Sequence, residues 1–179
     1  MRQFPLIKYA EVSAVNRKYF DHFNNKLGSI PNLYGMLAHS EQALDAYYSL
    51  HHHALSLNTI ERVIVGIVVA SLNNSPYCLD SHIMVGKLNG LSNEEINQIV
   101  EGTIIFNERY HFLANLVTEI VVGKGRPREQ TVQRFLEAGY TVENMVDMIV
   151  CVADTTFTNF LTCSMGVPLD IPGGNENHA

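Results

Sequence analysis

The sequence predicts an all-α fold. Apolar residues recur at three- and four-residue spacing through most of the chain, while Gly, Pro, Ser, Thr and Asn interrupt this pattern where helices would begin and end. No segment alternates apolar and polar residues as a half-buried strand does. With 179 residues, of which 46% are hydrophobic and 17% charged, the chain can form one compact domain or two small fused repeats.

The first half of the chain is expected to form an extended arm over residues 1–9, where Pro5 blocks a helix, and then four helices. The signals that bound these helices are Gly28, Pro31, Ser40, Thr59 and Asn73. The expected ranges are Glu11–Lys26, Pro31–Ala38, Glu41–Leu57 and Ile60–Leu72. The last of these is apolar on nearly every face after Arg62, which is typical of a helix buried on all sides.

The second half of the chain is expected to form five helices and a loose tail over residues 168–179. The bounding signals are Pro76, Gly90, a capping box of Ser92 and Glu95, Gly123, Gly139 and Thr141. The expected ranges are Pro76–Asn89, Ser92–Glu101, Asn107–Val122, Arg126–Ala138 and Val142–Met165. The residues expected to face the core from the last helix are Met145, Met148, Ile149, Val152, Phe157, Phe160 and Leu161.

Two helix junctions, residues 89–96 and 138–145, resemble each other. Each contains a glycine stop, a hydroxyl cap and an acidic helix start. They suit either an internal repeat of one helical unit or two ordinary junctions, because caps of this type are common.

Composition excludes several classes of function. The net charge of −6 and the lack of a basic run argue against nucleic acid and against anionic membrane surfaces. The longest apolar stretch, Val63 to Leu72, is too short to span a bilayer. The N-terminal residues lack the apolar core of a signal peptide, so we expect a cytoplasmic protein.

No cofactor or metal is expected. The three cysteines are Cys78, Cys151 and Cys163, and no C-x-x-C pair is present that would indicate a structural zinc site. His51, His52 and His53 are consecutive on an expected helix, so they point about 100° apart and cannot all face one metal ion.

The segment Ser75 to His82 carries the strongest functional signal. Ser75 is a good N-cap and Pro76 suits the first helical position, which places Cys78 in the first turn of a helix. Free backbone N–H groups and the helix dipole favour a thiolate there. His82 follows one turn later on the same face, so the pair can attack a peroxide or a disulfide. The alternative interpretation is a buried cysteine with only a packing role, because free cysteine is often buried.

The central segment Glu61 to Ser92, with its run from Ala70 to His82, resembles the carboxymuconolactone decarboxylase family in its alkylhydroperoxidase AhpD-like branch. Segments on both sides, residues 28–40, 135–140 and 168–170, also resemble members of this family. The resemblance implies one AhpD-like domain over residues 1–179 that forms a homo-oligomer, either a trimer or a hexamer. It also implies thiol-dependent peroxide reduction by a C-x-x-C pair with a Glu–Cys–His proton relay.

Carried over by position, Cys78 corresponds to the peroxide-attacking cysteine and His82 to the relay histidine. Two positions depart from the family pattern. Ser75 stands in place of the first cysteine and cannot form a disulfide. Val63 stands where the relay glutamate is usual and cannot act as a base. Whether Ser75 is natural or an introduced change is left open by the sequence.

Glu61 and Tyr77 are the residues that could support the site. Glu61 is two residues from position 63, which turns its side chain about 200° away on a helix. We therefore favour for Glu61 the interpretation of a solvated first-turn residue stabilised by the helix dipole.

The leading hypothesis is an antioxidant, thiol-dependent peroxidase with Cys78 as nucleophile, His82 as proton relay, and turnover impaired or altered by Ser75. Its partners would be a hydroperoxide and an external thiol or dithiol, unless Cys151 or Cys163 lies close enough to react. One alternative is a decarboxylase or lactone-acting enzyme that uses His82 and one of Glu61, Arg62 or His39 on a carboxylate substrate. The other is a non-catalytic, redox-sensing oligomer.

Overall fold

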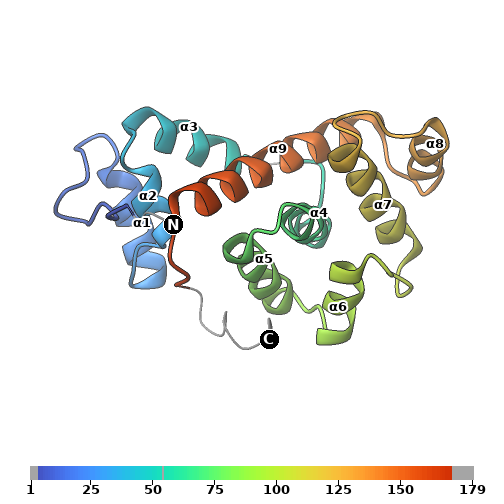
Figure 1. Cartoon of the computed structure of the whole chain (residues 1–179), viewed down its shortest axis with the longest axis horizontal. Coiled ribbons are helices and arrows are strands. Elements are labelled where there is room, and N and C mark those ends of the chain that lie inside the picture. Colours follow the sequence, from blue (N-terminus) through green and yellow to red (C-terminus); the bar gives the residue numbers. More distant parts are fainter. Residues whose placement is uncertain (1–3, 54, 171–179) are drawn as a thin grey trace. The chain divides into compact units, whose positions relative to one another are not determined.

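The computed structural model describes residues 4–53 and 55–170. In these ranges the chain forms nine α-helices and no strand, which confirms the all-α prediction (Figure 1). The helices are α1 (Arg17–Leu27), α2 (Asn32–Leu37), α3 (Glu41–His51), α4 (Thr59–Leu72), α5 (Pro76–Leu88), α6 (Asn93–Glu101), α7 (Glu108–Val122), α8 (Glu129–Glu137) and α9 (Val142–Met165).

The helices belong to two compact units. One comprises Met1–Ala54 and Leu161–Ala179, with α1 to α3 and the last residues of α9. The other comprises Leu55–Phe160, with α4 to α8 and most of α9. Every residue that the sequence predicts for the peroxidase site lies in the second unit.

The first unit packs its helices around buried apolar and aromatic side chains such as Phe20 and Leu44. The ring of His52 stacks on Tyr48 at a centroid distance of 4.0 Å, so this histidine packs within an aromatic cluster. The predicted arm is tied to α2, because the Ile7 N–H donates to the Gly35 carbonyl at 3.0 Å. The predicted tail falls mostly on residues 171–179, which lie outside the described residues.

The second unit is built around α4. Every residue of α4 from Val63 to Ala70 is buried, as the apolar run predicts. The helix packs against α5, α6 and α7, and Figure 1 shows it end-on among them. The helix α5 follows α4 after a short turn and packs against it.

Several helices begin or end at other residues than the sequence predicts, because local hydrogen bonds form turns or caps there. The first helix begins at Arg17 instead of Glu11, because turns closed on the carbonyls of Lys8 and Ser13 precede it. The third helix ends at His51, and the residues up to Leu57 form the connection to α4. Asn58, and not Thr59, caps α4, and α8 begins at Glu129.

The two similar junctions use the same chemistry. Ser92 and Glu95 form a capping box, and Thr141 and Asn144 exchange equivalent bonds at the start of α9. Shared caps explain the similarity of the two segments, and an internal repeat stays a prediction.

The prediction for the core face of α9 is wrong in part. Met148 is fully buried, and Met145 and Val152 pack partly against the core. In contrast, Ile149, Phe157 and Phe160 are exposed. The structure therefore buries one edge of the predicted face and leaves the other edge in solvent.

Candidate functional site

Cys78 is the third residue of α5, at the buried beginning of the helix. Pro76 is the first residue, and Ser75 occupies the N-cap with an extended backbone (φ −106°, ψ 93°), as predicted. The Ser75 hydroxyl does not itself cap the helix. Ser75 and Cys78 are 1% and 4% exposed. The thiol therefore lies among the first N–H groups of a helix and is almost completely buried.

His82 follows Cys78 by one turn, and its ring packs against Gly66 of α4. A Cβ built on Gly66 would lie 2.4 Å from both Cε1 and Nδ1 of the imidazole, well inside van der Waals contact. Glycine at position 66 thus makes room for the ring. Because residues four apart on a helix share a face, Cys78 and His82 lie on the side of α5 that packs against α4.

Val63 lies one turn further along the same contact. It is buried, and its Cγ1 would lie 3.1 Å from a Cβ built on Gly86 of α5. The ring of His82 packs against Gly66, and Val63 packs against Gly86 one turn away. Position 63 is therefore next to the position that faces the imidazole along the α4–α5 contact. The resemblance implies a relay glutamate at position 63, but in this chain the aliphatic side chain of Val63 occupies that position.

The prediction that Glu61 is solvated is wrong, because the residue is buried. One carboxylate oxygen accepts the Asn58 N–H at 2.9 Å, and the other accepts Nε of Arg109 on α7 at 3.2 Å. The Arg109 guanidinium lies 4.0 Å above the Tyr140 ring. Tyr140 in turn stacks on Phe135 of α8. Glu61 therefore joins the start of α4 to α7 and has a structural role.

Replacing Glu61 by Gln is expected to lower the free energy of unfolding by about 1–2 kcal/mol, because the amide keeps the cap but loses the ion pair with partly exposed Arg109. Glu95→Gln is the matched control, since Glu95 forms the same box on α6 without an arginine partner. We expect a change below about 0.5 kcal/mol for the control. Urea denaturation measures both, and equal losses would contradict the role of the ion pair.

Tyr77, the other supporting residue, is buried beside Cys78. Consecutive helical residues differ in direction by about 100°, so its side chain leaves α5 on a different side from that of Cys78. Its role at the site stays a prediction.

The other two cysteines differ in environment. Cys151 on α9 is buried, and this burial raises the pKa of its thiol to about 11, although Arg62 opposes the shift. At neutral pH this thiol is protonated and a poor nucleophile. Cys163 is half-buried and belongs to the first unit, whereas Cys151 belongs to the second.

Two cavities of about 550 and 400 Å³ lie between α7 and α8. Arg109, Phe112 and Arg134 are among their lining residues. Neither cavity is lined by Cys78 or His82, so both are separate from the cysteine site. Among residues 4–53 and 55–170, no group of three or more His, Cys, Asp or Glu side chains could hold a metal ion.

Residues 41–108, which include the whole α4–α5 pair, match the family model of the Carboxymuconolactone decarboxylase family. The match covers less than half of the chain. The match confirms the resemblance seen in the sequence. No curated protein sequence matches the chain.

The fold is that of AhpD-like proteins. A peroxidase-related protein with an alkylhydroperoxidase AhpD core from Ralstonia eutropha JMP134 has a TM-score of 0.86 at 17% identity, over 94% of this chain and 92% of that one. A peroxidase-related protein from Silicibacter sp. TM1040 gives 0.81 at 17% identity, over 94% of each chain. The debrominase Bmp8, in a variant complex with 2,3,4-tribromopyrrole, gives 0.76 at 11% identity, over 94% of this chain and 91% of that one.

The sequence alone missed Gly66 and Arg109. The signal for Gly66 was available, since an isolated glycine inside an apolar helix often marks a close approach. For Arg109 no signal existed, because its partner Glu61 is 48 residues away in the chain.

Proposed function

We propose that this chain is a thiol-dependent peroxidase-like protein in which Cys78 reacts with a hydroperoxide and His82 relays a proton. The family-model match over residues 41–108 and the fold shared with peroxidase-related proteins support a peroxidase-related function. The observation that carries the assignment to particular residues is the space left by Gly66, which holds the imidazole on the face of α5 that also bears Cys78.

The reaction would begin with attack of the Cys78 thiolate on the terminal oxygen of a hydroperoxide. The O–O bond breaks, the sulfur is oxidised to a sulfenic acid, and the leaving alkoxide takes a proton from His82 and departs as an alcohol. An external thiol then condenses with the sulfenic acid and releases water. A second thiol reduces the mixed disulfide and regenerates Cys78.

Ser75 changes the second half of this cycle. In a C-x-x-C pair, the first cysteine would displace water from the sulfenic acid and form an internal disulfide. A serine hydroxyl cannot do so, and the raised pKa of Cys151 makes that thiol a poor substitute. We therefore propose that regeneration depends on an external thiol and is slow.

The decarboxylase or lactone-acting alternative has less support from the contacts. The Glu61 carboxylate is held by Arg109 and by the backbone of Asn58. A ring nitrogen of His39, in the first unit, lies 2.6 Å from the Pro5 carbonyl oxygen. Both side chains already have structural partners.

The test is a single-turnover assay of the reduced chain with cumene hydroperoxide at pH 7, followed by dimedone trapping and mass spectrometry. We expect about one equivalent of peroxide consumed per chain and label on Cys78. Cys78→Ser should abolish both, whereas Cys151→Ser should change neither.

Peroxide consumption that survives Cys78→Ser, or the absence of reaction in the intact chain, would contradict the proposal. A parallel assay with a brominated pyrrole examines whether the chain shares the reaction named for Bmp8. Debromination without peroxide reduction would replace the proposed substrate class.

A further inference from the structure

The turn between α4 and α5 precedes the Cys78 site and consists of residues 73–75. Asn73 is the C-cap of α4, and Ser75 is the N-cap of α5. The three N–H groups of this turn donate to carbonyl oxygens in the last residues of α4, at 3.0 and 3.1 Å. Cys78 lies three residues after the N-cap, so the conformation of this turn sets the place of the thiol.

The first turn of α5 lacks a restraint that neighbouring helices have. The side chains of Asn58, Ser92 and Asn107 cap α4, α6 and α7, whereas the Ser75 hydroxyl makes no such bond to α5. A helix start without a side-chain cap is less stable and frays more readily. The first turn of α5 therefore depends on other contacts to stay helical.

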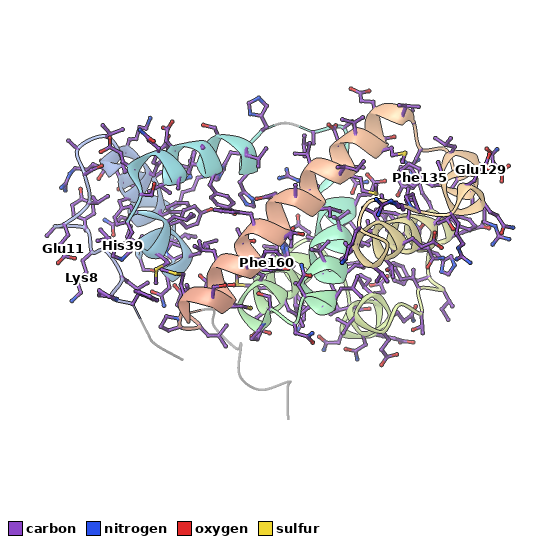
Figure 2. The ribbon with its side chains drawn as sticks, turned by 45° about the horizontal axis from the view of Figure 1, so that its top comes forward. Lys8, Glu11, His39, Glu129, Phe135 and Phe160 are labelled. Atoms are coloured by element: carbon purple, nitrogen blue, oxygen red, sulfur yellow. The ribbon has the colours of Figure 1, made fainter. Side chains whose placement is uncertain are left out.

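A side chain of α9 holds the turn from outside. Nδ2 of Asn73 donates to Oδ1 of Asn159 at 3.1 Å, across 86 residues of sequence, and we call these two residues the asparagine pair. Both belong to the second unit. Asn159 precedes Phe160, which Figure 2 labels on α9. Because a hydrogen bond requires a narrow range of distance and angle, the asparagine pair fixes the turn more closely than an apolar contact would.

The rest of α5 is held by different contacts. The ring of His82 packs against Gly66 in the middle of the helix, and Gly86 meets a side chain of α4 near its end. These contacts lie after the first turn of α5, whereas the asparagine pair acts just before it. The position of Cys78, in that first turn, is therefore sensitive to the asparagine pair.

We propose that Asn159 is a positioning residue for the reaction at Cys78, which it serves through Asn73; this role rests on the proposed function of Cys78 as the nucleophile. While the asparagine pair is formed, the first turn of α5 stays helical. The Cys78 sulfur then remains among the first N–H groups of the helix and on the same face as His82. When the pair is broken, the turn frays and the thiolate moves relative to the imidazole. A misplacement of about 1 Å can slow a reaction by about 100-fold.

Two variants break the asparagine pair from either side. Asn159→Leu removes the acceptor and keeps a side chain of similar size, and Asn73→Ala removes the donor. The matched control is Asn144→Ala, because Asn144 also lies on α9 and donates to Ser56 at 2.8 Å. This bond is roughly 22 Å along the helix from Asn159. Circular dichroism checks the folding of each variant, and Asn73→Ala, at a half-buried residue, carries the test if Asn159→Leu does not fold.

Hydrogen exchange of the Leu79 amide, measured by NMR, reports fraying of the first turn. This N–H donates to the Ser75 carbonyl at 2.9 Å and closes the first turn of α5. Loss of a hydrogen bond of ordinary strength makes opening about fivefold more frequent, so we expect exchange to accelerate by this factor in Asn159→Leu and in Asn73→Ala. The double variant should exchange no faster than the single ones, because both changes remove the same bond. Asn144→Ala should leave the exchange rate unchanged.

Two reactions of Cys78 at pH 7 separate positioning from stability. Iodoacetamide needs only the thiolate, whereas cumene hydroperoxide also needs a proton for the leaving alkoxide. We expect both variants of the asparagine pair to react with the hydroperoxide about tenfold more slowly. Alkylation should change by less than about threefold, because fraying weakens the support of the thiolate but also exposes it. The ratio of the two rates, followed by mass spectrometry of the Cys78 peptide, should therefore fall, and Asn144→Ala should leave it unchanged.

An unchanged ratio of rates would overturn the proposal even with faster Leu79 exchange, because Asn159 would then only stabilise the fold. Equal effects of Asn144→Ala would overturn it as well. If the wild-type chain does not react with the hydroperoxide, the proposed function fails, and the exchange of the Leu79 amide still decides whether Asn159 holds the turn. Unchanged exchange in both variants of the asparagine pair would show that it does not.

Discussion

Replacing Ser75 by cysteine is expected to convert slow regeneration by an external thiol into faster turnover through an internal disulfide. The N-cap and third residues of a helix lie about one turn apart, within the roughly 4.4–6.8 Å between Cα atoms that a disulfide requires. The new thiol could therefore attack a sulfenic acid on Cys78 and release it as a disulfide that a dithiol reduces. With excess dithiol and cumene hydroperoxide, we expect the rate of peroxide consumption to rise by about tenfold or more over that of the wild-type chain, which depends on slow regeneration by the external thiol.

Two variants control this experiment. Ser75→Ala removes the hydroxyl without adding a thiol and should behave like the wild-type chain. Ser75→Cys combined with Cys78→Ser keeps the new thiol but removes the nucleophile, and it should lose peroxide consumption. If Ser75→Cys forms the disulfide without faster consumption, the remainder of the site is not competent. Adding Val63→Glu would then test whether the missing carboxylate limits the reaction.

Replacing Gly66 by alanine is expected to destabilise the α4–α5 pair and to displace His82. The new methyl group would lie 2.4 Å from the imidazole, and overpacking of this kind costs about 1–3 kcal/mol. This cost exceeds the gain of about 1 kcal/mol from the better helix propensity of alanine. Urea denaturation should show the loss, and dimedone labelling of Cys78 should become slower because the proton relay is displaced.

Gly86→Ala is the matched control for Gly66→Ala. Its Cβ would meet methyl groups of Val63, Leu91 and Ile96 at 3.1, 3.2 and 4.0 Å, which can shift slightly, so we expect little change in either measurement. Adding His82→Ala to Gly66→Ala removes the clash. The double variant should therefore have a free energy of unfolding about 1–3 kcal/mol higher than the sum of the two single effects predicts. Additive losses would mean that the imidazole does not occupy the space above Gly66.

The sequence determined the helices and their order to within a few residues, except where turns replaced helix before Arg17 and after His51. Caps, glycines and helical periodicity are local, so a single segment reveals them. The same local chemistry placed Cys78 at a helix start with His82 one turn later.

The tertiary structure decided what no single segment contains. Glu61 is buried because Arg109, far along the chain, supplies a partner for its charge. The ring of His82 has its place because α5 packs against a glycine of α4. The sequence predicted an apolar core face for α9, but hydrogen bonds of Asn144 to Ser56 and of Asn73 to Asn159 also hold polar side chains of this helix inward. The physical reason is common to all three: local pattern sets the faces of a helix, whereas contacts distant in sequence choose which face is buried.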